Sequence, residues 1–218
     1  MRVEELDAIW PALREQVRSL KLPWIEQMTI RERDPFQVLI SCILSLRTQD
    51  KTTEEASRRL FQIARTPQAM AKVPAGKIEK AIYPVGFYRV KAGRIREMSG
   101  EIATKYGGRV PDTIEELLRL KGVGRKTANL VVTVGYNRDG ICVDTHVHRI
   151  TNRWGLVKTK NPTATEFALR EVLPKKYWKT INGYLVAFGQ GICKPVSPLC
   201  SQCRLAKVCG KAGVGKSR

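Results

Sequence analysis

The stretch LKGVGRKTANLVV, residues 120–132, sets two glycines and two cations directly before an apolar segment. Glycine is a poor helix former, so two of them are costly unless the backbone needs conformations that only glycine adopts readily. We therefore expect Gly122 and Gly124 to form a tight turn between a helix ending near Leu120 and one beginning near Arg125. The second helix should bury the face formed by Thr127, Leu130, Val131 and Val134.

The same turn has the features of an anion site. A turn without Cβ atoms can bring its backbone N–H groups close to another molecule, and a helix N-terminus adds unpaired donors and the positive end of the dipole. The alternative is a turn that only packs two helices tightly, and the glycines by themselves leave both readings open. Lys121, Arg125 and Lys126 around the turn favour the phosphate site.

Lys126 is unusual because it falls in the first turn of the expected helix, where a cation opposes the dipole. It lies at the edge of the face that begins with Thr127. A lysine in this position either binds phosphate or does chemistry. Crowded by positive charge and partly desolvated, its ammonium group would lose a proton more easily, as a nucleophilic amine requires.

The chain is strongly basic. Its 218 residues include 39 Lys and Arg against 20 Asp and Glu, a formal net charge of +19. A basic surface can serve solubility alone, but at this size the excess favours a nucleic-acid partner. No apolar run approaches the roughly 18 residues of a membrane helix, and the N-terminal segment lacks the pattern of a signal peptide. We expect a soluble intracellular protein without a membrane partner.

Helical spacing recurs along the chain and strand signals are weak, so we expect an all-α protein. Asp34 and Pro35 read as a cap and first residue of a helix burying Phe36, Leu39, Ile40, Ile43 and Leu44 on one face. Another helix carries Ile95, Met98, Ile102 and Tyr106 and ends at Gly107-Gly108. A short helix should open at Pro111-Asp112, and others should span 4–19, 51–64, 145–155, 163–172 and 176–188.

Six cysteines fall into two groups. Cys42 and Cys142 stand alone among apolar residues and are expected in the core. The other four are Cys193, Cys200, Cys203 and Cys209, in the spacing C-x6-C-x2-C-x5-C. Disulfides are disfavoured in a reducing compartment, which leaves tetrahedral zinc or an iron–sulfur cluster. The wide outer gaps suit a bulkier group and favour iron–sulfur over zinc.

The stretch CVDTHVHRITNRWG, residues 142–155, contains a second candidate site. Asp144 reads as a helix N-cap, although the apolar residues before it would half-bury its carboxylate. His146 and His148 are two positions apart and do not share a helix face. We therefore expect them to pack or to contact phosphate rather than to bind zinc as a pair.

Three motifs together resemble the helix-hairpin-helix DNA glycosylase superfamily, and within it the endonuclease III branch. They are LKGVGRKTA, then VDTHVHR with its aspartate about 18 positions after the lysine, and the four-cysteine spacing. The resemblance extends from about residue 30 to Cys209. It implies two all-α domains with a DNA-binding cleft between them. One is a six-helix barrel with the hairpin, residues 28–138, and the other is an iron–sulfur domain of residues 1–27 and 139–218.

The resemblance also implies roles for individual residues. Lys126 matches the nucleophile, Asp144 the essential aspartate, and the four cysteines the ligands of a [4Fe-4S] cluster. The hairpin grips phosphate, in many members with a monovalent cation, and Phe87 in VGFYRVKA matches an apolar wedge. The expected DNA contacts are Arg47, Gln49, Phe87, Lys121, Gly122, Gly124, Arg125 and His146. Arg47 in ILSLRTQD stands where many members have Gln, which leaves the base preference open.

The function implied is base excision repair of double-stranded DNA. The enzyme would remove oxidised pyrimidines and cleave the abasic site by β-elimination through a lysine Schiff base. It would act as a monomer in the cytoplasm, on nucleoid DNA if the source is prokaryotic. The alternatives are an adenine or thymine mismatch glycosylase, which generally lacks a lysine at the place of Lys126, and a DNA-binding module without catalytic activity.

Overall fold

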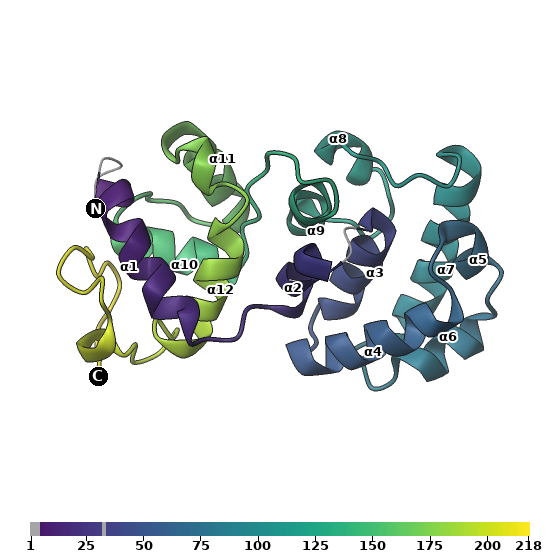
Figure 1. The fold of residues 1–218 in the computed structure, drawn as a ribbon, viewed down its shortest axis with the longest axis horizontal. Coiled ribbons are helices and arrows are strands. Elements are labelled where there is room, and N and C mark those ends of the chain that lie inside the picture. Colours follow the sequence, from purple (N-terminus) through teal and green to yellow (C-terminus); the bar gives the residue numbers. More distant parts are fainter. Residues whose placement is uncertain (1–4, 32–33) are drawn as a thin grey trace. The chain divides into compact units, whose positions relative to one another are not determined.

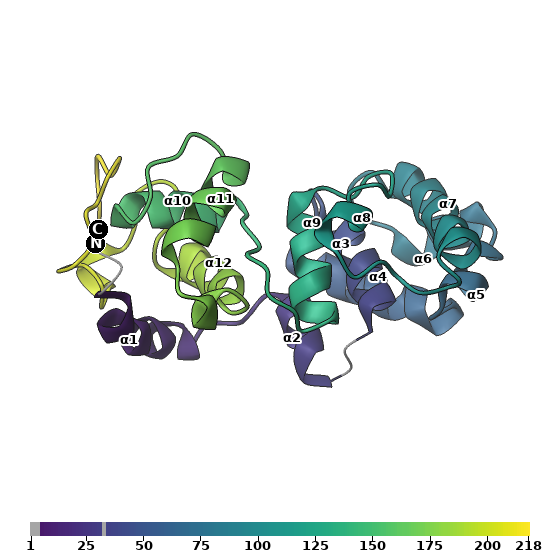
Figure 2. The same cartoon turned by 90° about the horizontal axis from the view of Figure 1, so that it is seen from above.

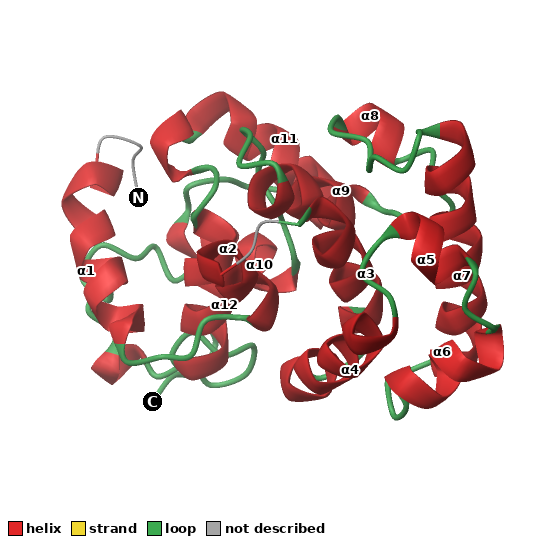
Figure 3. Ribbon diagram, turned by 45° about the vertical axis from the view of Figure 1, so that its right-hand side comes forward, coloured by secondary structure: helices red, strands yellow, loops and turns green. Residues whose placement is uncertain are grey.

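The computed structural model describes residues 5–31 and 34–218. Every regular element in these ranges is helical and none is a strand (Figures 1 and 3), so the expected all-α class is confirmed. The longer helices are α1 (Leu6–Arg18), α2 (Trp24–Arg31), α3 (Pro35–Ser45), α4 (Asp50–Ile63), α6 (Ala75–Ile82), α7 (Tyr88–Lys105), α10 (Thr145–Trp154), α11 (Pro162–Val172) and α12 (Ile181–Gly191). The shorter elements are α5 (Pro67–Ala71), α8 (Ile114–Leu117), α9 (Arg125–Leu130), η2 (Val131–Gly135), η3 (Lys175–Tyr177) and η4 (Cys200–Gln202).

The chain divides into two compact units, each with its own core. One unit comprises Met1–Pro23 together with Ile141–Arg218, and the other comprises Trp24–Gly140. The discontinuous unit has a core between α1, α10 and α12, which Figure 2 shows with α11 beside them. Because α1 packs on α12, the two ends of the sequence share this hydrophobic core.

Helix α3 forms the centre of the continuous unit. Its cap is as expected: the Asp34 carboxylate accepts hydrogen bonds from the N–H groups of Phe36, at 2.8 Å, and Gln37, at 3.2 Å, and Pro35 is the first helical residue. The expected burial of a single face is wrong, because Val38, Ser41 and Cys42 on the other faces are buried as well. The physical reason is that α3 packs against α2, α4, α7, α9 and η2, which surround it.

Helix α7 follows the sequence prediction and the short helix α8 does not. The apolar positions Ile95, Met98 and Ile102 are buried, and α7 is followed by Gly107 and Gly108 with φ of 60° and 80°. Helix α8 begins at Ile114 instead of Pro111-Asp112. The hydroxyl oxygen of Thr113 accepts the N–H of Glu116 at 3.3 Å, and the hydroxyl donates to the Glu116 carboxylate at 3.2 Å, so the Thr113 side chain caps the helix.

Other boundaries agree to within two residues, except in one region. Residue 4 of the helix expected over 4–19 lies outside the described residues, and the rest corresponds to α1. The single helix expected over 176–188 is wrong, because η3 and α12 replace it and a turn separates them. In this turn the N–H of Thr180 donates to the Tyr177 carbonyl at 3.2 Å. Helices α2, α5 and α6 were not expected.

Candidate functional site

The glycine turn lies between α8 and α9. The N–H of Val123 donates to the Leu120 carbonyl at 3.0 Å, and α9 begins at Arg125 with Gly124 as its N-cap residue. Gly122 has a φ of 91°, in the left-handed region where glycine is strongly favoured. Gly124 has a φ of −101°, and a Cβ added there would meet no atom within 4 Å. The backbone therefore requires glycine at the first position, whereas the second leaves open space in front of the helix N-terminus.

Lys126 is the second residue of α9 and is half-buried, as is Arg125 before it. Its positive charge acts on the thiol of Cys42, a buried residue of α3. Burial raises the pKa of Cys42 to about 12, and the charge of Lys126 opposes that rise. Glu26 of α2 acts on the same thiol in the opposite sense, and burial raises the pKa of this carboxyl to about 7. Helices α2, α3 and α9 thus bring three titratable side chains into one partly buried region.

Arg47 and Phe87 are brought together although they are far apart in the sequence. Arg47 lies in the connection between α3 and α4, and Phe87 immediately precedes α7. The guanidinium carbon of Arg47 is 5.6 Å from the centre of the Phe87 ring. Both residues have left-handed backbones, with φ of 53° and 58°, and the Phe87 side chain is 62% exposed. Gln49, two residues after Arg47, is exposed and is the N-cap residue of α4.

The sequence analysis missed Lys91, which is only 6% exposed. Its ammonium group is hydrogen-bonded to the same connection that carries Arg47. A signal for it was present, because Lys91 precedes Ile95 by four residues and so continues the apolar face of α7. A lysine in a buried stripe is an anomaly that deserves a structural reason.

In the discontinuous unit, Asp144 is the N-cap residue of α10, as expected. Its carboxylate accepts the N–H groups of His146 and Val147 at 2.8 and 3.0 Å. The two histidines have separate partners: Arg149 donates to Nδ1 of His146 at 3.1 Å, and Nδ1 of His148 is hydrogen-bonded to the Thr165 hydroxyl at 2.6 Å. Their expected packing or phosphate roles stay a prediction.

The four clustered cysteines line one cavity in this unit, together with apolar side chains that include Trp154, Phe188 and Leu199. Burial, and to a smaller extent the charges of the other three cysteines, raise the pKa of Cys203 to about 11. The sulfur of Cys193 accepts a hydrogen bond from Arg153 at 3.4 Å, and that of Cys209 accepts the N–H of Lys211 at 3.4 Å. Buried thiolates need a compensating cation, so the donor set fits a metal–sulfur group.

The positions of these side chains do not indicate a site for a single metal ion. In the part of the chain that the structure describes, no group of three or more His, Cys, Asp or Glu side chains is arranged to hold one metal ion. The case for a cluster therefore rests on the shared cavity and on the chemistry of its four sulfurs. Cys42 and Cys142 are 1% exposed, which confirms the expectation that they belong to the core.

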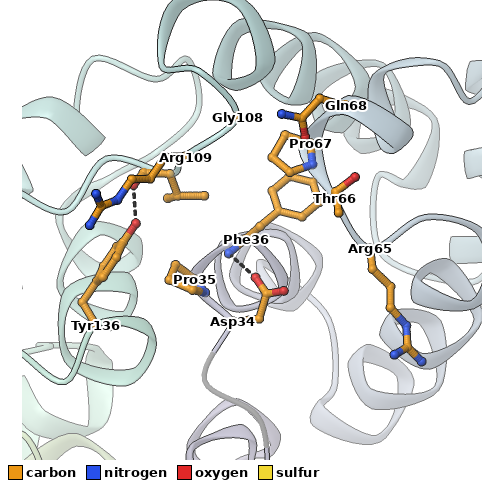
Figure 4. A pocket seen from close by; sticks show the side chains of 11 residues that line it. Asp34, Pro35, Phe36, Arg65, Thr66, Pro67, Gln68, Gly108, Arg109 and Tyr136 are labelled. Carbon is orange, nitrogen blue, oxygen red and sulfur yellow. Dashed lines mark hydrogen bonds between the residues drawn. The ribbon is translucent and has the colours of Figure 1, made fainter.

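A separate cavity of about 370 Å³ opens in the continuous unit (Figure 4). It is lined by Asp34, Pro35, Phe36, Arg65, Thr66, Pro67, Gln68, Gly108, Arg109, Val110 and Tyr136. Two hydrogen bonds join its lining residues: the N–H of Phe36 donates to the Asp34 carboxylate, and the Tyr136 hydroxyl donates to the Val110 carbonyl. None of the site residues expected from the sequence lines it.

The described helices include none that is long and apolar enough to cross a lipid bilayer. Residues 40–175 match the model of the HhH-GPD superfamily of base excision DNA repair proteins.

Individual relatives support the same family. The chain is 54% identical to endonuclease III of Thermotoga maritima over 179 residues, which cover 82% of this chain and 84% of that protein. It is 43% identical to endonuclease III-like protein 1 of Gallus gallus, over 81% of this chain and 64% of that longer protein. A solved structure of a trapped endonuclease III–DNA covalent intermediate is similar with a TM-score of 0.83, at 32% identity and over 97% of each chain.

The helical fold of this chain is thus shared, over nearly its whole length, with a solved endonuclease III–DNA complex. The chain belongs to the HhH-GPD superfamily of base excision DNA repair proteins. The resemblance to endonuclease III that the sequence motifs indicate is confirmed, and with it the assignment of the chain as a base excision repair DNA glycosylase.

Proposed function

We propose that this enzyme removes oxidised pyrimidines from duplex DNA and cleaves the resulting abasic site, with Lys126 as the nucleophile. The observation that carries the proposal is the position of Lys126. It is half-buried in the first turn of α9, directly after a turn whose second glycine faces open space. An amine in this position can be held beside a DNA backbone that the turn binds.

The chemistry begins with extrusion of the damaged nucleotide, because its sugar cannot be reached while the base is stacked. The neutral amine of Lys126 attacks C1′, the bond from C1′ to the base breaks, and the opened sugar forms a Schiff base with the lysine. A proton then leaves C2′, the bond from C3′ to oxygen breaks, and the 3′ phosphate departs. Asp144, as a carboxylate, stabilises positive charge on the sugar and helps to move protons.

The hairpin binds a DNA phosphate in this proposal. Among the described residues no atom would meet a Cβ at position 124, and although glycine is also a favourable N-cap residue for α9, this open face leaves room for a DNA phosphate. Lys121 is exposed and Arg125 half-exposed beside the turn, where both add attraction for phosphate. A monovalent cation would be held by carbonyl groups of the turn, and His146 would contact the backbone near Asp144.

The pair of Arg47 and Phe87 opens the duplex in this proposal. The exposed Phe87 ring would insert as an apolar wedge, and Arg47 with Gln49 would fill the gap left by the extruded nucleotide. An arginine at this place can only donate hydrogen bonds to base edges, whereas a glutamine can both donate and accept, so the choice of opposite base is expected to differ from that of glutamine-containing relatives.

Cys193, Cys200, Cys203 and Cys209 would hold a [4Fe-4S] cluster. The cluster, when bound, would anchor the basic segment after Lys194 and neutralise the buried thiolates. The discontinuous unit would then be the cluster domain and the continuous unit the six-helix barrel with the hairpin. The partner is double-stranded DNA with damaged bases or abasic sites, bound by a monomer in the compartment that holds the DNA.

Borohydride trapping tests the proposal. Wild-type protein should form a covalent adduct with duplex DNA that contains thymine glycol or an abasic site. Lys126→Ala should lose it, whereas Lys105→Ala, at an exposed lysine paired with Glu101 on α7, should keep it. An undiminished adduct in Lys126→Ala would remove this lysine from the mechanism. Cleavage of adenine or thymine mismatches in preference to thymine glycol would favour the alternative glycosylase.

A further inference from the structure

Two exposed tips of the continuous unit are joined at their bases. The connection with Arg47 and the turn before Phe87 approach so closely that a Cβ on Gly86 would lie 2.5 Å from the Arg47 carbonyl oxygen. The N–H of Gly86 donates to the Thr48 hydroxyl at 3.2 Å. Left-handed backbones at two residues that are not glycine are unfavourable and persist only where surrounding contacts hold them.

The contacts that hold them converge on one buried ammonium group. Nζ of Lys91 donates to the carbonyls of Leu44, at 2.8 Å, and Leu46, at 2.5 Å, and lies 3.3 Å from the Thr48 hydroxyl. These three neutral oxygens match the three donors of an ammonium group. Burying such a charge is unfavourable, and an apolar side chain would fill the same space at a smaller free-energy cost. The lysine is therefore best explained by polar groups around it that require a hydrogen-bond donor.

The polar groups that require this donor lie at the end of α3. The helix ends at Ser45 and its C-cap residue Leu46 is extended, so the carbonyl of Leu44 has no partner within the helix. A positive charge at a helix C-terminus also interacts favourably with the dipole. Lys91 therefore caps α3 from another helix and fixes the direction in which the chain leaves it.

We propose that Lys91 is a positioning residue that holds Arg47 and Phe87 together in the conformation that enters the duplex. The inference rests on the proposed roles of those two residues. The Thr48 hydroxyl links the two tips, since it contacts Lys91 Nζ and accepts the N–H of Gly86. Loss of the ammonium group would therefore loosen both the connection that carries Arg47 and the turn before Phe87. Burial lowers the pKa of Lys91 to about 8, in agreement with its confined environment.

Lys91→Met tests the proposal, because methionine matches the length and apolar stem of lysine without its donors. The rate of base removal from thymine-glycol duplex in a single turnover should fall about tenfold or more, as expected when a reacting geometry loses its support. Cleavage of an abasic single strand needs no opening of a duplex and should stay within about twofold of wild type. Lys105→Met on the same helix should change neither rate.

A coupled variant separates positioning from general stabilisation. In an Arg47→Ala, Phe87→Ala background, Lys91→Met should add little further loss of base removal, because the groups it positions are already absent. If Lys91→Met lowers both activities equally, or adds its full effect in that background, the positioning role is overturned. Should the methionine variant not fold, Thr48→Val removes the link alone and should give a smaller loss of the same kind.

Hydrogen exchange tests the contact network without reference to activity. The amide of Gly86 should exchange about tenfold faster in Lys91→Met than in wild type, whereas the amide of Ile102 further along α7 should not change. Unchanged exchange at Gly86 would overturn the inference. If wild-type protein fails to form a borohydride adduct, the proposed function fails, and the exchange result still decides whether Lys91 holds the two tips.

Discussion

Replacing Glu26 by glutamine should stabilise the enzyme, and increasingly so as the pH rises. Glu26 lies in the first turn of α2, and burial raises the pKa of its carboxyl from an ordinary 4.5 to about 7. Below pH 4.5 the carboxyl is protonated in the folded and unfolded states alike. Between pH 4.5 and about pH 7 the carboxyl is ionised in the unfolded chain but still protonated in the folded one. Unfolding then releases a proton, so the free energy of unfolding falls as the pH rises. At about 1.4 kcal/mol per pH unit the loss reaches about 3 kcal/mol above pH 7.

Glutamine carries no charge at any pH and should abolish this loss. Guanidinium denaturation of holoenzyme, followed by tryptophan fluorescence, would measure the free energy of unfolding at pH 5 and pH 8. The advantage of Glu26→Gln over wild type should grow by about 2 to 3 kcal/mol between these values. Glu115→Gln, at an exposed position of α8, provides the matched control and should show no such growth. A constant difference between Glu26→Gln and wild type at both pH values would refute the reasoning.

Three further predictions concern the site. Asp144→Asn keeps a good N-cap and should bind abasic DNA with near-normal affinity while turnover falls about 100-fold or more; a collapse of binding in gel-shift titrations would instead make Asp144 mainly a cap. Gly122→Ala should cost about 1 kcal/mol of stability because of its left-handed backbone, whereas Gly124→Ala, which only replaces a favourable N-cap residue, should cost less than about 1 kcal/mol and yet bind duplex DNA more weakly; equal binding by Gly124→Ala would contradict the phosphate site. Cys200→Ser should lower the iron and sulfide content of purified protein, and zinc in place of iron in wild type would contradict the cluster.

Much of the fold could be predicted from local chemistry. Asp34-Pro35 marked the start of α3 correctly because a cap and a proline at the first helical position act within one turn. The glycines after α7 marked its end for the same reason. The T-x-x-E pattern of Thr113 and Glu116, which is typical of a helix start, was equally visible, and its omission placed the start of α8 too early.

What could not be predicted depends on contacts between distant segments. The spacing of α3 indicates one apolar face, and only the helices packed around it explain why Ser41 and Cys42 are buried too. Likewise the sequence points to Arg47 and Phe87 separately, and it does not contain their pairing or the bonds of Lys91. Helix α2, only eight residues long, was missed, yet it supplies Glu26 to the region of Lys126.

The central claim is that one amine bonds covalently to deoxyribose. Digestion of the borohydride-trapped complex and mass spectrometry of the DNA-linked peptide would identify the attachment site directly. We predict a reduced sugar adduct on the Nζ atom of Lys126 and on no other lysine. An adduct on the N-terminal amine, on Lys121 or on Lys91 would contradict the account, even if the enzyme cleaved damaged DNA normally.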